Sequence, residues 1–465
     1  MSIHSDRAPA PVDGACGSRC GPPAPPDRAL PAPPGGPQSR RQFGCTLMAA
    51  LAGGVPGAVR AVPAMSGHRM VADFEPQRAM WLGWDPAFER LILDLAAVLK
   101  PHVALVFLVR DDEMRAAAMS ALTRRGLAAA QLRFVVEPLA PFFVRDALVF
   151  TSDAAGNNGV VDFRWSQYGY PSWCARRHAG RRAQVAACAA RVDPVPDRLE
   201  RALADQLQLP LWHSALGLEG GGLEHNGQGL VIANYELLAS RNPGRRREWM
   251  EAELLRLPGS KRVVWLEQGL AEDPLHRASI SADYVGWGTG GHTDEFVRFA
   301  DPRTVLLAWP DGTDAARHRV SGITRRRMER NLVRLQAVRL TDGSRLRIIK
   351  VPMPSPVERA VFLSAAADTA WSDQWTAEDF PVADRRRQGQ RVMQIAIASW
   401  LNFVVANGVV VLPDYLAHGT PPDRQAQVKH LFESVFPGRE VRFVDALDAN
   451  WVGGGLHCAT LSQGA

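Results

Sequence analysis

The sequence predicts an α/β fold of five repeated ββαβ units, arranged as a five-bladed α/β propeller. Four hairpin signals occur along the chain, and each is followed by a helix pattern and then by a strand pattern. The fifth unit is split between the two ends of the chain, so pairing of the ends would close a ring. The prediction therefore depends on the repeat and not on any single motif.

The chain before residue 65 is not expected to contribute to this fold. Residues 1–38 are dense in Pro, Gly and Ala and predict a disordered leader. Residues 39–64 resemble a twin-arginine export signal, because Arg40 and Arg41 precede an apolar run, 47–59, and the small-residue pattern 62–64. Residues 65–465 are then the folded domain, and we expect it in the periplasm or secreted, with the twin-arginine translocase as its partner during export.

The elements of the repeat can be placed in order. Turn residues such as Asn-Gly separate the apolar runs of the hairpins. The predicted hairpins cover residues 147–163, 218–233, 293–309 and 399–412, the helices 197–207, 245–257, 315–335 and 424–435, and the following strands 209–213, 262–266, 345–351 and 440–444. In the fifth unit, the strand after Cys458 is expected to pair with residues 80–84, followed by a helix over 86–99 and a strand over 103–109.

Composition excludes some classes of partner. The chain has 46% hydrophobic residues, enough for a large core, and a net charge of +6 that includes the arginines of the leader. In the rest of the chain the positive and negative charges are nearly balanced, so we expect no nucleic-acid partner. No apolar run of the folded domain reaches membrane-spanning length, so we expect no membrane insertion.

Three cysteines follow the export signal, namely Cys174, Cys188 and Cys458. A protein that is exported in the folded state is not expected to have a disulfide framework, although a bridge between Cys174 and Cys188 remains possible. Cys458 is the cysteine that we expect to be free.

Polar residues mark the start of each predicted unit. They are Asp146, Glu219, His292 with Asp294, Asn402 and Cys458. In a ring, equivalent positions converge on the axis. Residues two apart on a strand share a face, so we expect His292 and Asp294 to point together into the centre, whereas His457 would face away from Cys458 and be structural.

These side chains suit chemistry on a guanidinium group. Cys458 follows three glycines that permit a close approach to a ligand, so it is either a nucleophile or a small buried apolar residue. Asp146 and Asp294 could each accept two hydrogen bonds from a planar cation. The Cys458 thiolate would attack the guanidinium carbon, and His292 would protonate the departing ammonia.

Six ordered blocks between residues 74 and 463 carry a family resemblance. They read FEPQRAMWLGW, FFVRD, LEGGGLEHNGQG, GHTDEFVRF, ASWLNFVVANGVVVLP and GGGLHCAT. This pattern resembles the agmatine deiminase and bacterial peptidylarginine deiminase family of the guanidino-group-modifying (pentein) superfamily. The resemblance implies a hydrolase with Cys458 as nucleophile, His292 as acid/base, Asp146 and Asp294 as guanidinium ligands, and Glu219 and Asn402 in supporting positions. It implies no metal and no organic cofactor.

The chain departs from the family pattern in the pocket lining. Phe143 stands where agmatine-type members have Trp, and Glu295 and Gly455 stand where Asn is usual. The arginine pair that binds a substrate carboxylate in the exported type is not evident, although Arg164 remains nearby. Phe143, Arg145 and Arg164 are further candidates for contact with the substrate.

Agmatine, which would give N-carbamoylputrescine on the route to putrescine, is the expected substrate, and the arginine side chain of a peptide is the alternative. Residues 352–391 interrupt the repeat and are expected to form an acidic and aromatic rim, with Trp371 and Trp375, that favours a substrate ending in an amine. Three other functions stay open. They are a metal hydrolase with His292, Asp294 and Cys458 as ligands, a non-catalytic binder of arginine-like ligands, and an amidinotransferase.

Overall fold

The computed structural model describes residues 65–191, 198–365, 374–384 and 386–465. The predicted leader and export signal therefore lie outside the described residues, as do Trp371 and the start of the predicted helix 197–207. Within the described part of the chain, no helix is long and apolar enough to cross a membrane.

The predicted repeat is present as five sheets with one strand pattern. In each sheet an antiparallel hairpin is followed by a third strand that runs parallel to the second. The strands are β5 (Val149–Ser152), β6 (Asn158–Arg164) and β7 (Leu211–Gly217); β8 (Leu223–His225), β9 (Leu230–Asn234) and β10 (Arg262–Leu266); β13 (Val297–Asp301), β14 (Thr304–Trp309) and β15 (Arg347–Pro352); β18 (Val404–Val405), β19 (Val409–Pro413) and β20 (Glu440–Val444); and β21 (Thr460–Gly464), β2 (Gln77–Gly83) and β3 (Ala104–Val109). The mixed α/β fold class is confirmed.

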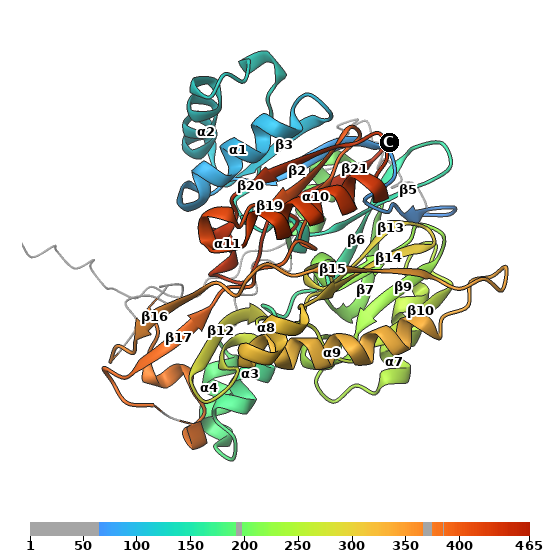
Figure 1. Ribbon diagram of the computed structural model, residues 1–465. Coiled ribbons are helices and arrows are strands. Elements are labelled where there is room, and N and C mark those ends of the chain that lie inside the picture. Colours follow the sequence, from blue (N-terminus) through green and yellow to red (C-terminus); the bar gives the residue numbers. More distant parts are fainter. Residues whose placement is uncertain (1–64, 192–197, 366–373, 385) are drawn as a thin grey trace, which may run out of the picture. The chain divides into compact units, whose positions relative to one another are not determined.

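The fifth sheet joins the two ends of the described chain. β21 pairs antiparallel with β2, with Trp81 opposite Leu461, and Figure 1 shows the red and blue strands side by side. Two short strands extend the sheets: β1 (Arg69–Met70) pairs with β5, and β4 (Arg133–Val136) pairs with β3.

Helices connect the second and third strands of each unit. They are α1 (Glu89–Leu99) in the fifth unit; α3 (Tyr170–Arg177), α4 (Arg182–Ala189) and α5 (Leu199–Leu207) in the first; α6 (Tyr235–Arg241) and α7 (Arg247–Arg256) in the second; α8 (Gly312–Arg317) and α9 (Arg319–Gln336) in the third; and α10 (Pro422–Val435) in the fourth. α2 (Asp112–Arg124) links β3 to β4, and α11 (Leu447–Asn450) links β20 to β21.

The helices cover the sheets because one face of each carries the apolar residues. In α10, Val428 and Phe432 are fully buried, and the Phe432 ring packs edge-on against Phe403 at 5.0 Å. Burial of side chains of this size supplies the main stabilising free energy, about 1.5–3 kcal/mol each.

A sixth sheet was not predicted. It has the order β11 (Leu275–Ser279), β12 (Tyr284–Thr289), β17 (Arg391–Ile395) and β16 (Glu358–Phe362). Pairing between β12 and β17 joins two segments about a hundred residues apart, and a turn motif in the sequence cannot predict a contact over such a distance. The segment 352–391 is therefore not simply a loop.

The sixth sheet also corrects the predicted aromatic rim. Trp375 is 1% exposed and packs with Phe380 and Val392 in a small core of its own, so it is not a surface aromatic residue. Two acids of the segment are paired as well, because Glu378 contacts Arg177 at 3.2 Å and Asp379 lies 3.7 Å from Arg277. The acidic and aromatic character that we expected of this rim is thus weaker than its composition indicated.

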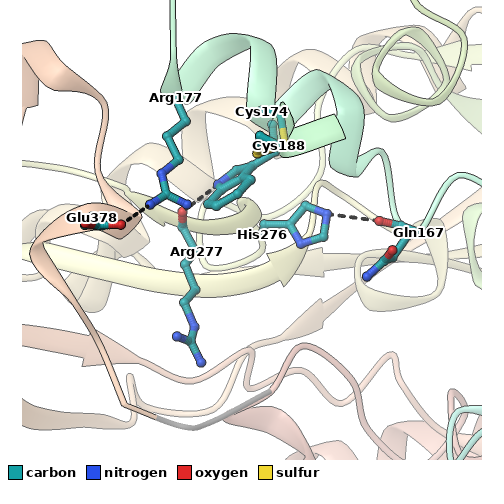
Figure 2. The surroundings of a disulfide bond; sticks show 8 residues. Gln167, Cys174, Arg177, Cys188, His276, Arg277 and Glu378 are labelled. Atoms are coloured by element: carbon teal, nitrogen blue, oxygen red, sulfur yellow. Dashed lines mark hydrogen bonds and ion pairs between the residues drawn. A yellow bond between two sulfur atoms is a disulfide. The ribbon is translucent and has the colours of Figure 1, made fainter. Parts of the chain in front are cut away.

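A disulfide joins Cys174 on α3 to Cys188 on α4, and Cys458 is free. The expectation for Cys458 is confirmed, and of the two alternatives for the other cysteines the structure contains the bridge. Figure 2 shows what surrounds it: Arg177 is directed at Glu378, and the His276 ring is directed at the backbone oxygen of Gln167. The bridge therefore fixes a helix pair that packs against the sixth sheet.

Replacing both Cys174 and Cys188 with Ser should destabilise this helix pair. A bridge that closes a loop of this length, with a sequence separation of 14, contributes on the order of 3 kcal/mol. Hydrogen exchange should accelerate in residues 170–190 of the variant and in the wild type treated with dithiothreitol. Unchanged protection in both samples would show that the bridge does not hold these helices.

Candidate active site

Cys458 lies two residues before β21, at the end of a glycine-rich segment. It is 2% exposed. Gly454 and Gly455 allow the close packing that the sequence predicts, because a Cβ atom on Gly454 would lie 2.4 Å from the Phe143 ring, and one on Gly455 would lie 2.6 Å from Asn402 Oδ1. Any larger residue at these two positions would displace the segment that carries the thiol.

The residues that mark the five units are brought together in this buried region. Asp146, Glu219, His292 and Asp294 lie in or directly before three short 3-10 helices that precede the hairpins: Val144–Asp146, Gly220–Gly222 and Thr293–Glu295. His292 and Asp294 do point the same way, with Nδ1 and Oδ1 4.0 Å apart. The alternation of a β-strand does not explain this orientation, because residues Thr293–Glu295 form a 3-10 helix.

Hydrogen bonds join each unit to the next around the site. The contacts run from Gly221 N to Asp146 Oδ1 (3.0 Å), Thr293 Oγ1 to Gly221 O (3.0 Å), Asn402 Nδ2 to Glu295 Oε1 (2.8 Å), His457 N to Asn402 Oδ1 (2.8 Å) and Arg145 N to Cys458 O (3.1 Å). The last of these contacts returns to the first unit. The site is therefore held by all five units at once.

The Cys458 sulfur is surrounded by polar groups. Asn402 Nδ2 donates to Sγ at 3.1 Å, and Sγ lies 3.6 Å from Asp294 Oδ2 and 3.9 Å from Glu295 Oε1. Burial, followed by the charges of Asp294 and Glu295, raises the pKa of the thiol well above its usual value. Without a cation nearby, the sulfur is held as a thiol.

His292 is placed to act as an acid. Its Nε2 lies 3.3 Å from Glu219 Oε2, and its Nδ1 lies 3.8 Å from Asp146 Oδ1. Burial alone would lower the pKa of the ring, but Asp146, Glu219 and Asp294 outweigh it and raise that pKa to about 9. His292 is thus an imidazolium near neutral pH.

Glu219 supports this arrangement as a charged partner. The buried Arg241 guanidinium donates from Nε to both Glu219 oxygens, at 3.0 and 2.9 Å. Burial would raise the pKa of Glu219, but Arg241 and His292 lower it below the usual value. The carboxylate therefore stays ionised and holds the charge of His292.

Three buried polar atoms of the site have no hydrogen-bond partner within the described residues: His292 Nδ1, Asp294 Oδ1 and Glu295 Oε2. Gly221 lies against two of these side chains, because a Cβ there would lie 2.6 Å from His292 Nδ1 and 3.0 Å from Asp294 Oδ2. Buried polar atoms without a partner are costly, by about 1–3 kcal/mol each. A ligand that donates hydrogen bonds would satisfy the two carboxylate oxygens.

His457 contributes more than the sequence indicated. Its ring connects two carboxylates, with Nδ1 2.7 Å from Asp294 Oδ2 and Nε2 2.7 Å from Asp73 Oδ2. Asp73 is in turn bonded to Arg298 at 2.8 Å. His457 is therefore a positioning residue for Asp294. Burial would raise the pKa of Asp294, but His457 outweighs it and lowers that pKa.

Two predicted substrate contacts are not supported by the geometry. Arg145 donates from Nε to Thr460 O at 3.0 Å and pairs with Asp73 at 3.3 Å, so its guanidinium ties β21 to Asp73. Arg164 is exposed, and its guanidinium donates to Arg241 O at 2.6 Å. Both arginines are committed to contacts within the protein, so we place neither in the site. Phe143 lies against Gly454, at the edge of the segment that carries Cys458.

Tyr168 belongs to the site, although no sequence pattern pointed to it. Its hydroxyl donates to Asp146 Oδ2 at 3.1 Å, and its ring centre lies 6.0 Å from that of His292. Tyr168 and Gln167 adopt positive φ values of 53° and 48°, which non-glycine residues rarely do. This backbone conformation aims the hydroxyl at Asp146. Asp73, Arg241 and Glu295 were likewise not predicted as site residues.

A cation could also use part of this cluster. Donor atoms of Asp294, Glu295 and Cys458 lie within 4.8 Å of one another, whereas the metal-hydrolase alternative names His292 in place of Glu295. Within the described residues, His292 is therefore not part of the group whose donor atoms lie this close together.

Comparison with known proteins gives consistent results. Residues 69–463 match the model of the Porphyromonas-type peptidyl-arginine deiminase family. The agmatine deiminase of Pseudomonas putida is 26% identical over 420 residues, 88% of this chain and 98% of that protein. Two solved structures share the fold: an agmatine deiminase of Enterococcus faecalis (TM-score 0.61, 19% identity, covering 87% of this chain and 98% of that one) and a C. jejuni agmatine deiminase with substrate bound (TM-score 0.58, 15% identity, 86% and 97%). On the family match, which spans most of its length, this chain belongs to the Porphyromonas-type peptidyl-arginine deiminase family.

Proposed function

We propose that this protein is a guanidino-group deiminase that hydrolyses agmatine to N-carbamoylputrescine and ammonia, with Cys458 as the nucleophile. The observation that carries the proposal is the pair of unpartnered buried carboxylate oxygens of Asp294 and Glu295 beside the Cys458 sulfur. A planar guanidinium donates hydrogen bonds in several directions within one plane, which is what these acceptors lack. Similarity to proteins named agmatine deiminase supports the same substrate class.

The reaction follows from the placement of the groups. Asp146 and Asp294 accept from the guanidinium N–H groups, and the Cys458 thiolate attacks the central carbon, so that a C–S bond forms and a C=N π pair moves to nitrogen. His292 gives its proton to that nitrogen, which leaves as ammonia. Water then attacks the thiouronium carbon and gives a proton to His292, and the C–S bond breaks to release the urea product.

Substrate charge helps to activate the thiol. The carboxylates that raise the pKa of Cys458 in the free protein are opposed by the positive charge of a bound guanidinium. The thiol therefore loses its proton when the guanidinium is bound beside it. Asp294 Oδ2, which lies 3.6 Å from Cys458 Sγ, can take this proton.

We also infer that the five ββαβ units form a closed five-bladed propeller around this site. The ring of hydrogen bonds from Asp146 through Gly221, Glu295, Asn402 and Cys458 back to Arg145 N supports this arrangement. In a propeller of this kind, equivalent segments of the blades meet at the axis, which explains why site residues so distant in sequence converge.

Residues 352–391 remain our candidate for a rim over the site. The sixth sheet contacts the segment before Cys458, because Gln394 Nε2 donates to Trp451 O at 3.0 Å. Since its acids are partly paired, the choice of agmatine now depends less on this rim and more on Arg164, whose guanidinium donates to Arg241 O and is therefore not available to a substrate carboxylate. Peptidyl-arginine is the second candidate because the family match bears that name.

The pH dependence of kcat/KM should follow His292 and Asp146. His292 has a raised pKa of about 9, so its acid form is present below that value and is lost as the pH rises through it. Burial raises the pKa of Asp146 to about 6, so guanidinium binding weakens as the pH falls through 6. Initial rates from pH 5 to 10 should give a bell-shaped profile.

The Asp146→Asn variant should lose the part of the acid limb that titrates near pH 6, and more than about tenfold in kcat/KM, a loss above about 1.4 kcal/mol. Asp153→Asn, at a half-buried residue that accepts hydrogen bonds within its own hairpin connection, is the matched control and should leave both limbs in place. An active Asp146→Asn protein with an unchanged acid limb would remove Asp146 from guanidinium binding.

A colorimetric ureido assay on agmatine, free arginine and an arginine-containing peptide tests the substrate. Agmatine should give the highest kcat/KM, the Cys458→Ser variant should give no product, and prior treatment with EDTA should not change the rate. A kcat/KM for the peptide at least about tenfold above that for agmatine, a 1.4 kcal/mol preference, would replace the proposed substrate. No ureido product from any of the three would overturn the deiminase proposal.

We further propose that the protein is exported through the twin-arginine pathway. The Cys174–Cys188 bridge supports an oxidising compartment, whereas the pathway is inferred from the Arg40–Arg41 pair alone. Replacing Arg40 and Arg41 with Lys should leave the protein in the cytoplasm, as measured by fractionation, because the signal is recognised through its arginine pair. Wild-type distribution of the double variant would mean that residues 39–64 are not such a signal.

A further inference from the structure

Glu295 occupies an unusual position beside the nucleophile. It is the last residue of the 3-10 helix that contains Asp294, and it is 1% exposed. Its Oε1 accepts from Asn402 Nδ2 at 2.8 Å and lies 3.9 Å from Cys458 Sγ. Its Oε2 is buried and has no hydrogen-bond partner within the described residues. The mechanism above assigns it no role.

The neighbours of Glu295 do not compensate a negative charge. Glu219 is paired with Arg241, and Asp294 is hydrogen-bonded to His457, but Glu295 forms no ion pair within the described part of the chain. Besides burial, the charges that act on it most strongly are those of Asp294, Asp273 and Asp146, opposed by Arg298, and Glu295 acts in turn on Cys458 and Tyr415.

A buried carboxyl in such surroundings holds its proton. Burial, followed by the charges of Asp294 and Asp273, raises the pKa of Glu295 well above its usual value. Glu272, another buried glutamate with a raised pKa, lies elsewhere in the fold and is bonded to the Thr324 hydroxyl. It provides a matched control for the experiments below.

We propose that Glu295 is a third guanidinium-binding carboxyl, which is protonated in the free protein and releases its proton when the cation enters. The proposal rests on the function proposed above. A guanidinium beside Cys458 would supply both the positive charge that Glu295 lacks and the N–H donor that its Oε2 lacks. The site therefore selects cations, because only a charged ligand favours ionisation of Glu295.

Proton release can be measured directly. In the Cys458→Ala variant, which has no thiol to titrate and no turnover, agmatine binding is followed by calorimetry at pH 7 in phosphate and in Tris. The difference in heat between the buffers should correspond to roughly one proton released per ligand. Adding Glu295→Gln should bring this value close to zero while binding is retained, and adding Glu272→Gln should leave it unchanged.

A second measurement needs no change at Glu295. The agmatine Kd of Cys458→Ala should fall by close to tenfold per pH unit between about pH 6.5 and 8, because one proton leaves on binding. A Kd that does not change with pH, or proton release that survives Glu295→Gln, would overturn the role of Glu295 and leave the deiminase proposal intact. If neither agmatine nor any other guanidino compound binds to Cys458→Ala, the proposed function itself fails.

Discussion

The structure depends on keeping several carboxylates buried around one sulfur atom. Asp146, Glu219, Asp294 and Glu295 are all less than 7% exposed, and water cannot screen them. Uncompensated buried charges cost several kcal/mol each, so such a cluster persists only if each charge is paired or neutralised. Arg241 pairs with Glu219, the ring of His457 is hydrogen-bonded to Asp294, and His292 lies between Asp146 and Glu219. The negative charge that these partners do not compensate is the property that allows the site to bind a cation.

The fold provides this cluster by bringing equivalent turns together. Each carboxylate lies at the start of a hairpin, where a short 3-10 turn leaves backbone N–H groups free to bind side chains of the neighbouring unit. Gly221 N donates to Asp146, and Asn402 bridges the backbone at His457 to Glu295. Because these contacts cross between units, the loss of one turn would disturb two sheets. Close packing of Gly454 against Phe143 and of Gly455 against Asn402 then holds the segment that carries the Cys458 sulfur in the cluster.

The sequence predicts most of this arrangement, and the parts that it misses have physical reasons. Local turn signals identify the hairpins of four units, the repeat indicates the pairing of the two ends of the chain, and the ordered polar residues at the starts of the units include Cys458, His292, Asp146 and Asp294. Contacts that depend on exact backbone conformation are not visible in a sequence. Tyr168 reaches Asp146 only because two residues adopt positive φ, and the sixth sheet pairs strands that no turn connects. Arg145 was misassigned because a basic residue beside a catalytic block can equally hold the protein together.

Covalent labelling of Cys458 tests the central claim most directly. A haloacetamidine carries the amidinium head that the carboxylates recognise together with a carbon that a thiolate can alkylate, so it should react where the protein forms its thiolate. We expect one label per molecule of mature protein, mapped by peptide mass to Cys458, with loss of activity in proportion to labelling and protection by agmatine. Activity that persists after Cys458 is fully labelled, or inactivation with the Cys458 peptide unmodified, would contradict a reaction through this sulfur.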